Sequence, residues 1–172
     1  MSEELSSQKA TTGENDRRYI AFSLGSEQYA IPLLQAKEFI GITEPTPVPQ
    51  TPDYFKGIIN LRGQVISVID LKEKLRLPKS DAPAKDSREA SIIILNLGNL
   101  FLGVIVDSIN SVLALNEDEL GPPPTLDKSS AGDYIIGVAR KDGRLTLILD
   151  IEALLNVQDI EALRKNSKAN AA

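Results

Sequence analysis

Short runs of alternating apolar and polar residues, separated by turns rich in glycine and proline, dominate the chain. In the segment 18–24, for example, Ile20, Phe22 and Leu24 fall on one face, as in a strand with one buried side. No uninterrupted apolar run exceeds the length of a strand, so the pattern predicts an all-β protein without a segment that spans a bilayer. The expected strands lie at 18–24, 29–33, 37–42, 58–60, 65–69, 92–97, 101–106, 109–115, 134–139 and 145–149.

One small unit occurs twice along the chain. The segment 57–71 returns as 137–151 at a constant offset of 80 positions (137 − 57 = 80), and 20–25 is likewise similar to 93–98. Each copy spans only about 70 residues, which is marginal for an independent fold. The duplication therefore predicts two pseudo-symmetric, five-stranded barrels that pack together. Positions matched at the offset of 80 include Gly63 with Gly143, Val65 with Leu145, Val68 with Ile148, Asp70 with Asp150 and Leu75 with Leu155.

Polar segments set the expected domain organisation. Their composition cannot offset the entropy of ordering, so the two ends of the chain are expected to be disordered tails. The expected boundaries are a tail at 1–16, a folded domain at 17–165 and a second tail at 166–172. Within the domain we expect a first barrel at 17–77, a linker at 78–88, and a second barrel with a terminal helix at 89–165, with strand exchange between the barrels left open.

Asp70 and Asp150 form a symmetric pair of carboxylates, each directly after a strand. Asp70 stands three residues before Glu73, which is the spacing of a helix capping box. Duplicated capping explains why both copies have the aspartate, whereas an acid–base pair would need both carboxylates in one cleft. We therefore expect short helical turns here and no catalysis. A longer helix is expected over 154–164.

The composition argues against several classes of function. A net charge of −5 and a pI near 4.9 disfavour nucleic acid, which needs a concentrated basic face. The absence of histidine and cysteine removes the commonest general base, the commonest metal ligand, thiolate chemistry and disulfides. We expect no cofactor and no metal. Because nothing at the N-terminus resembles a signal peptide, we expect a cytoplasmic protein.

The turn Leu61-Arg62-Gly63 is the strongest candidate for a binding site. The second copy makes its turn with Lys141-Asp142-Gly143, and Asp-Gly is a strong hairpin signal, so the fold does not require Leu61 and Arg62. A bulky apolar residue beside a guanidinium is typical of an interface anchor. The alternative is a solvated surface arginine. Glu38 is either a solvent-facing strand glutamate or the partner of Arg62 in an exposed ion pair.

The segment from Lys56 to Leu71 carries a family resemblance. It reads Lys-Gly-Ile-Ile-Asn-Leu-Arg-Gly-Gln-Val-Ile-Ser-Val-Ile-Asp-Leu. This is similar to the signature Lys-Gly-x-x-Asn-Leu-Arg-Gly-x-x-x-Pro-x-x-Asp-Leu of the CheW family of chemotaxis coupling proteins. The chain departs from the family pattern at Ser67, which replaces a proline, and at Pro32, where an acidic or polar residue is usual. The resemblance runs from about Tyr19 to Leu163 and includes 22–25, 29–31, 38–40 and 103–107.

The resemblance implies SH3-like barrels, no catalysis and two partners. These are the cytoplasmic hairpin tip of methyl-accepting chemoreceptors and the regulatory domain of the histidine kinase CheA, so the protein would be recruited to membrane receptor arrays without inserting into the membrane. Arg62 and Glu38 match residues linked with coupling, and Gly57 matches a position where the backbone stays uncrowded. Leu33, Ala36, Val104 and Val106 match the apolar lining of a receptor groove, although ordinary barrel core uses the same residue types.

Two other classes of function stay open at this point. One is a CheW-like regulatory domain related to the adaptor-receiver protein CheV or to the terminal domain of CheA. The other is a small-barrel enzyme or ligand-binding protein, because aspartate, glutamate and lysine could still act without histidine or cysteine.

Deleting residues 1–16 and 166–172 together is expected to leave the melting temperature within a few degrees of the full chain, because segments of this composition add no packed surface. Thermal unfolding followed by circular dichroism tests this. A cooperative loss of structure on trimming would show that one of the tails is part of a sheet.

Overall fold

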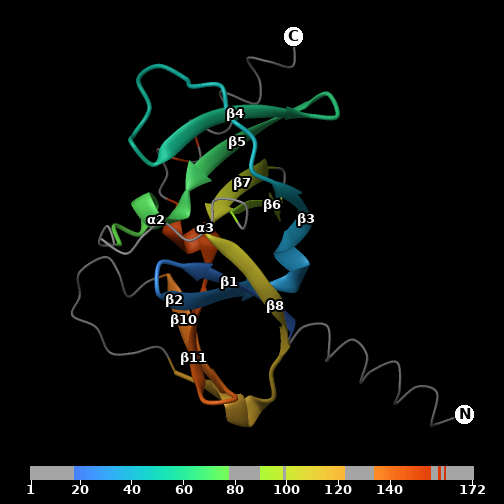
Figure 1. Cartoon of the computed structure of the whole chain (residues 1–172), viewed down its shortest axis with the longest axis vertical. Coiled ribbons are helices and arrows are strands. Elements are labelled where there is room, and N and C mark those ends of the chain that lie inside the picture. The colour runs from blue at the N-terminus through green and yellow to red at the C-terminus, as the bar shows by residue number, and fades with distance from the viewer. Residues whose placement is uncertain are drawn as a thin grey trace, which may run out of the picture.

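The computed structural model describes residues 18–77, 90–98, 100–122, 134–155, 159 and 161. Two β-sheets lie one above the other, with one-turn helices beside their junction (Figure 1). The expected all-β class is confirmed, and the expected strands are present, mostly within two residues of their predicted ends. The expected tails and the linker at 78–88 lie outside the described residues.

The lower sheet in Figure 1 has the strand order β8-β1-β2-β11-β10-β9, and the upper sheet has the order β3-β6-β7-β5-β4. The lower strands are β1 (Arg18–Leu24), β2 (Glu27–Pro32), β8 (Ser108–Ala114), β9 (Leu120–Gly121), β10 (Ile135–Lys141) and β11 (Arg144–Leu149). The upper strands are β3 (Ala36–Gly41), β4 (Phe55–Leu61), β5 (Gln64–Asp70), β6 (Ser91–Leu97) and β7 (Leu100–Val106). The helical turns are η1 (Leu33–Gln35), α2 (Leu71–Lys74), η3 (Glu117–Glu119) and α3 (Ile151–Leu154).

Each sheet combines strands from both halves of the chain. The hairpin β1–β2 lies in the lower sheet with β8, β10 and β11, and the hairpin β6–β7 lies in the upper sheet with β3, β4 and β5. The two sheets therefore do not follow the contiguous halves 17–77 and 89–165. The connections explain the difference: the three residues of η1 join β2 to β3, and Asp107 alone joins β7 to β8, so the chain passes directly into the other sheet.

The largest apolar core lies between the two sheets. Phe22 from β1 and Leu95 from β6 are fully buried there, and burial of such a side chain stabilises the fold by about 1.5–3 kcal/mol. Neighbouring residues of β6 point to opposite faces. Ile92 and Ile94 consequently pack in a separate cluster with residues of β4 and β5. Burial of both faces accounts for the uninterrupted apolar run at 92–95.

The two aspartates cap one-turn helices, as the sequence predicts. Asp70 accepts hydrogen bonds from the backbone N–H groups of Lys72 and Glu73, and Asp150 accepts one from Ala153. The reciprocal arm of the expected capping box is absent, because the Asp70 N–H donates to the Tyr54 carbonyl and Glu73 pairs with Lys56. Of the helix expected at 154–164, most lies outside the described residues.

The segment 42–54 between β3 and β4, called the strap below, crosses the edge of β4 at Gly57. The Thr46 N–H donates to the Ile58 carbonyl at 2.8 Å, and the Ile58 N–H donates to the Thr46 carbonyl at 2.9 Å. Gly57 has a φ of 137°, and a Cβ at this position would lie 2.1 Å from the Thr46 oxygen. The equivalent Gly137 has no positive φ, and its Cβ would lie 3.3 Å from the Gly121 oxygen. Only Gly57 is thus demanded by both its conformation and a backbone neighbour.

Gly57→Ala is expected to lower the free energy of unfolding by about 2–4 kcal/mol, because the strap must move and the backbone is strained. Gly137→Ala, the matched control in the second copy, is expected to cost about 1 kcal/mol or less. Urea unfolding midpoints measure both. Equal losses would mean that the strap does not need Gly57.

Candidate partner-binding site

The turn between β4 and β5 holds an arginine in a conformation that arginine seldom adopts. Leu61 pairs with Gln64, and the two residues between them have positive φ angles, 54° at Arg62 and 83° at Gly63. Such a turn favours asparagine, aspartate or glycine at its first position. The second copy follows the rule with Asp142 at 53°. Arg62 is therefore a poor choice for the turn alone.

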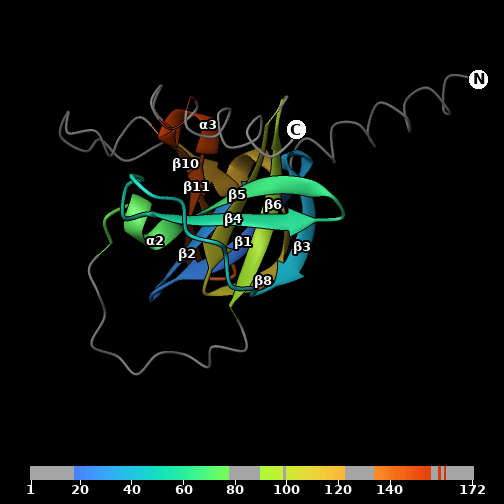
Figure 2. The same cartoon turned by 90° about the horizontal axis from the view of Figure 1, so that it is seen from above.

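The Arg62 guanidinium makes a two-pronged ion pair with Glu38. Its Nη2 lies 2.5 Å from Glu38 Oε1 and its Nη1 lies 3.1 Å from Oε2. Glu38 is on β3 and Arg62 follows β4, so the pair joins the two edge strands of the upper sheet. In Figure 2, which views the molecule from above, the β4–β5 hairpin runs across the middle of the picture with its turn on the side where β3 runs. Three-quarters of the Arg62 side chain stays exposed (75 %) against 21 % for Glu38.

The lower sheet joins its corresponding strands by a different contact. Lys141 of β10 donates from Nζ to the Ala114 carbonyl of β8 at 2.7 Å, and its Nζ lies 4.0 Å from Glu119 Oε2. Asp142, at the tip of that turn, is exposed. The two copies therefore join their corresponding strands by different contacts, an arginine–glutamate ion pair in one and a lysine–carbonyl hydrogen bond in the other. Of these two equivalent tip residues, only Arg62 presents a large cationic surface.

Exposed apolar side chains also lie on η1 and β3. Leu34 of η1 is 68 % exposed, and Phe39 of β3 is 45 % exposed. Lys37 lies on the same strand with its Nζ 4.0 Å from the centre of the Phe101 ring. The sequence did not single out Leu34 and Phe39 as exposed, because the alternation in 37–42 does not reveal which face of this strand is covered by the second half of the chain.

The remaining predicted residues occupy different environments. Leu33 of η1 and Ala36, the first residue of β3, are half-buried and pack on the inter-sheet core. Val104 and Val106 are 0 % and 1 % exposed within that core, so neither presents surface to a partner in this conformation. The reason is that β7 lies in the middle of the upper sheet and directs the side chains of Val104 and Val106 toward the lower sheet. Leu61 is half-buried against the cluster inside the upper sheet, and Gly57 acts through its backbone.

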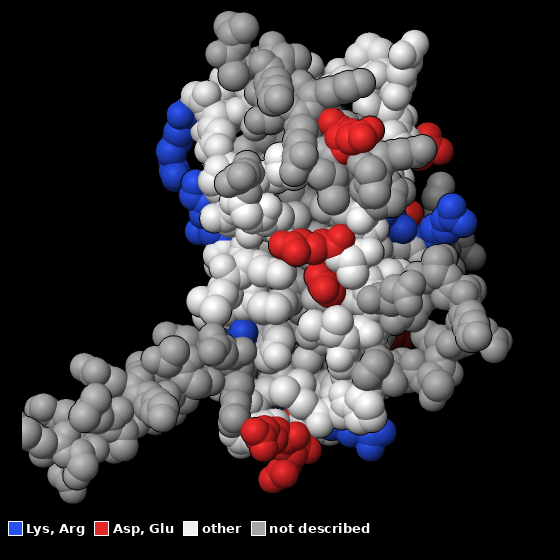
Figure 3. All heavy atoms as spheres, turned by 180° about the vertical axis from the view of Figure 1, so that it is seen from behind, with Lys and Arg blue, Asp and Glu red and all other residues white. Residues whose placement is uncertain are grey.

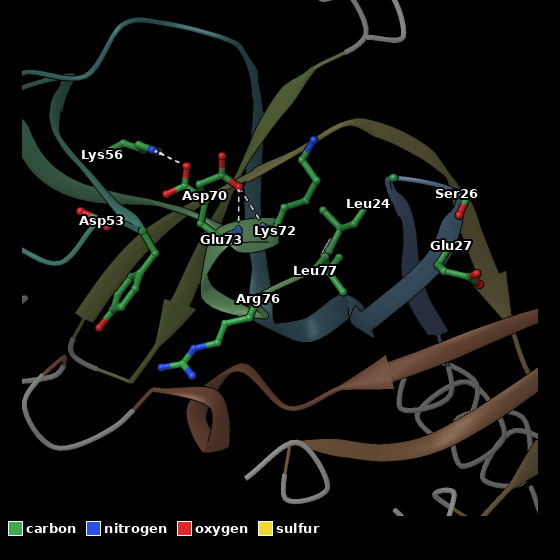
Figure 4. Close-up of a pocket in the computed structure, with 12 residues that line it drawn as sticks. Leu24, Ser26, Glu27, Asp53, Lys56, Asp70, Lys72, Glu73, Arg76 and Leu77 are labelled. Atoms are coloured by element: carbon green, nitrogen blue, oxygen red, sulfur yellow. Dashed lines mark hydrogen bonds and ion pairs between the residues drawn. The ribbon is translucent and has the colours of Figure 1, made fainter. Parts of the chain in front are cut away.

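A mixed-charge groove lies on the other side of the junction, beside α2 (Figure 4). Several of its charged side chains are paired. Lys56 pairs with Glu73 at 2.8 Å, and Lys72 pairs with Asp107 at 2.9 Å. Asp70 is occupied as a helix cap. Within the described residues, no group of three or more acidic side chains is placed to hold a metal ion.

A buried cluster of polar groups ties the segment after α3 to the first half of the chain. The Tyr54 hydroxyl donates to Asp159, and Lys74 pairs with Asp159 at 2.8 Å. The Lys74 Nζ also lies 4.2 Å from the centre of the Tyr54 ring. The side chains of Lys74 and Asp159 are 11 % and 8 % exposed. Burial, followed by the hydrogen bond and charge of Asp159, raises the pKa of Tyr54 well above its ordinary value.

The face shown in Figure 3 carries no continuous basic patch. On the side shown in Figure 3, lysine and arginine lie in small groups separated by uncharged surface and by acidic groups. This arrangement and the net charge of −5 lack the concentrated positive field that a nucleic acid needs. Among the described helices, none is long and apolar enough to cross a membrane.

These observations define a fold of two sheets with exchanged hairpins, in which an exposed arginine turn is paired across the edge strands of one sheet. The family model described as "CheW-like domain" matches residues 18–159, which is most of the chain. The chain therefore belongs to the CheW-like family.

Proteins of similar length and sequence support this assignment. "Chemotaxis protein CheW" of Klebsiella aerogenes is 29 % identical over 154 residues, covering 90 % of both chains. "Chemotaxis protein CheW" of Bacillus subtilis is 32 % identical over 151 residues, covering 88 % of this chain and 92 % of that protein. The crystal structure of scaffolding protein TtCheW from Thermoanaerobacter tengcongensis matches with a TM-score of 0.73 and 30 % identity, covering 84 % of this chain and 95 % of that one.

Tyr54→Phe is expected to reduce the loss of stability at alkaline pH. The folded pKa of Tyr54 is raised, so its contribution is complete below the unfolded pKa of about 10 and is lost as the pH rises above that value. Urea midpoints of the wild type and the variant at about pH 8 to 11.5 measure the difference. Tyr134→Phe is the comparison, because burial alone raises the pKa of Tyr134. Parallel pH curves for Tyr54→Phe and the wild type would contradict the expectation.

Proposed function

We propose that the protein is a non-enzymatic adaptor that couples chemoreceptors to the histidine kinase CheA. Its partners are the cytoplasmic hairpin tip of methyl-accepting chemoreceptors and the regulatory domain of the kinase. The observation that carries the proposal is Arg62, which occupies an unfavourable turn conformation and remains 75 % exposed although it pairs with Glu38. A residue that costs conformational energy and adds little to the core is typical of a functional site.

The exposed side chains of η1, β3 and the β4–β5 turn suit a helical protein partner. Leu34 and Phe39 supply exposed apolar area, and Arg62 and Lys37 supply cationic groups. An amphipathic helix binds such a surface through its apolar face, with acidic residues at the rim. The Glu38 carboxylate holds the guanidinium in one orientation before the partner arrives, which lowers the entropy lost on binding.

The proposed activity needs two partners and no chemical step. Holding receptor and kinase together raises their effective concentration, and preference for one arrangement of the assembly couples the state of one to the other. An enzyme is disfavoured because Asp70 and Asp150 cap separate helices and most other buried or half-buried charges are paired. Placement in receptor arrays at the membrane, with the protein itself cytoplasmic, is part of the same proposal.

A role as a CheV-like or kinase-embedded regulatory domain is less well supported. The Klebsiella aerogenes and Bacillus subtilis relatives are named CheW, and the match covers 90 % and 92 % of their lengths. The solved structure of similar fold is named a scaffolding protein and is covered over 95 % of its chain. These matches favour an adaptor of this size.

Arg62→Asn is the sharpest test, because Asn-Gly is a preferred sequence for this turn. Relief of the positive-φ strain is expected to offset the lost surface ion pair, so the free energy of unfolding should stay within about 1 kcal/mol of the wild type. Receptor-dependent activation of the kinase is expected to fall about tenfold or more, because a desolvated arginine anchor contributes about 2 kcal/mol to binding.

Asp142→Asn is the matched control, since it places the same residue in the equivalent turn of the second copy and should leave both stability and activation unchanged. Arg62→Lys keeps the charge but not the planar guanidinium, so this variant should retain only part of the wild-type activation. A stable Arg62→Asn protein with full activation would contradict the role of this turn. Failure of the wild-type chain to join receptor and kinase in a co-sedimentation assay would contradict the adaptor itself.

A further inference from the structure

The backbone alone does not decide which hairpin enters which sheet. In the lower sheet, β1 pairs antiparallel with β8 and β2 pairs parallel with β11. In the upper sheet, β6 pairs antiparallel with β3 and β7 pairs parallel with β5. The main-chain pairings are thus equivalent, and either hairpin could form them. Side chains must supply the discrimination.

A polar network on the inner face of the lower sheet matches the hairpin β1–β2 to its neighbours. Gln28 of β2 donates from Nε2 to Thr146 Oγ1 at 2.7 Å, and its Oε1 accepts from Asn110 Nδ2 at 2.9 Å. Asn110 also donates to Ser23 Oγ at 2.9 Å. Gln28 is 7 % exposed and Thr146 is 2 % exposed. Both ends of a buried amide are therefore satisfied by residues from the other half of the chain.

The equivalent positions in the upper sheet hold a different set. Phe101 corresponds to Gln28 at the offset of the hairpins (93 − 20 = 73), and Ile66 corresponds to Thr146 at the offset of 80. Lys37 corresponds to Asn110, because each is the extra residue at a register shift, in β3 and β8 respectively. The Lys37 Nζ lies 4.0 Å from the centre of the Phe101 ring, and Ile66 belongs to the apolar cluster.

We propose that these two sets of side chains direct each hairpin to its own sheet. The lower set is Gln28, Asn110 and Thr146, and the upper set is Phe101, Lys37 and Ile66. If β1–β2 entered an upper sheet, the Gln28 Nε2 would face Ile66 without an acceptor, and Lys37 would lose the aromatic ring. The same mismatch would meet the hairpin in its own first half and in the first half of a second copy of this chain. The network thereby directs β1–β2 to β8 and β11 and disfavours exchange with another molecule through the upper sheet.

Engineered disulfides can report the pairing, because the chain has no cysteine of its own. Tyr19 is the register partner of Leu113, so Tyr19→Cys with Leu113→Cys reports the observed arrangement. Tyr19 corresponds to Ile92, whose register partner is Ile40, so Tyr19→Cys with Ile40→Cys reports the exchanged one. Chains refolded from denaturant and then oxidised are resolved on denaturing gels, which separate crosslinks within one chain from those between two.

Gln28→Phe gives the hairpin β1–β2 the side chain that the upper sheet accepts. The exchanged crosslink is expected to rise about tenfold, as one lost buried hydrogen-bond set implies. Adding Asn110→Lys and Thr146→Ile makes the lower sheet accept phenylalanine as well, so the triple variant should show a smaller rise. Leu24→Ala is the control, because it weakens the same hairpin in the inter-sheet core without changing the network, and it should show no rise.

The proposal is overturned if neither Gln28→Phe nor the triple variant raises the exchanged crosslink, or if Leu24→Ala raises it equally. Should Gln28→Phe fail to fold, the triple variant, in which both sets are internally matched, still supplies the measurement. The double variant Gln28→Met with Thr146→Val removes the hydrogen bonds of the Gln28 amide while keeping a similar side-chain volume. Its crosslinks give an independent measurement of the effect of the network.

Discussion

The shared core between the two sheets is the interaction on which the rest of the structure depends. Among the described residues, each sheet encloses a small apolar cluster of its own, around Ile59, Ile66, Val68, Ile92 and Ile94 in the upper sheet and around Leu115, Ala139 and Ile148 in the lower one. The common core between the sheets buries whole faces of β1, β2, β6 and β7. It also fixes the junction beside which η1 and β3 carry the exposed apolar residues. Loss of this core would remove the site and the fold together.

Electrostatic contacts act at the edges, where apolar packing ends. The Arg62–Glu38 pair joins β3 to the β4 side in the upper sheet, and Lys141 joins β10 to β8 in the lower sheet. Exposed pairs of this kind add at most about 1 kcal/mol to stability. Their larger effect is geometric, because they hold a turn or a side chain in one position. In the first copy that position serves the surface we assign to partners, and in the second copy it serves the turn alone.

Local pattern predicted the strands and the aspartate caps, because alternation and capping depend on residues close in sequence. The pairing of Arg62 with Glu38 was one of two alternatives, and the structure contains the pair. Strand exchange could not be chosen from local pattern, since the apolar alternation is the same whichever sheet receives a hairpin and the polar partners that differ, such as Gln28 and Asn110, lie 82 positions apart. The contact of Tyr54 with Asp159, 105 positions apart, had no local signal at all.

The burial of Val104 and Val106 illustrates the same limit. Their residue type suits a binding groove as well as a core, and only the position of β7 in the middle of a sheet separates the two. Arg62 is the opposite case. The comparison of two copies of one turn within a single chain singled it out, and its backbone angle then gave a physical reason for the contrast.

The short connections between the sheets also have a mechanical meaning. A protein with two lobes usually bends at a flexible linker, but here η1 and the single residue Asp107 carry the chain across the junction twice. A displacement of β3 would be transmitted to β2, in the other sheet, through only three residues. The two sheets should therefore move together as one rigid body, which suits an adaptor that transmits small movements between its partners.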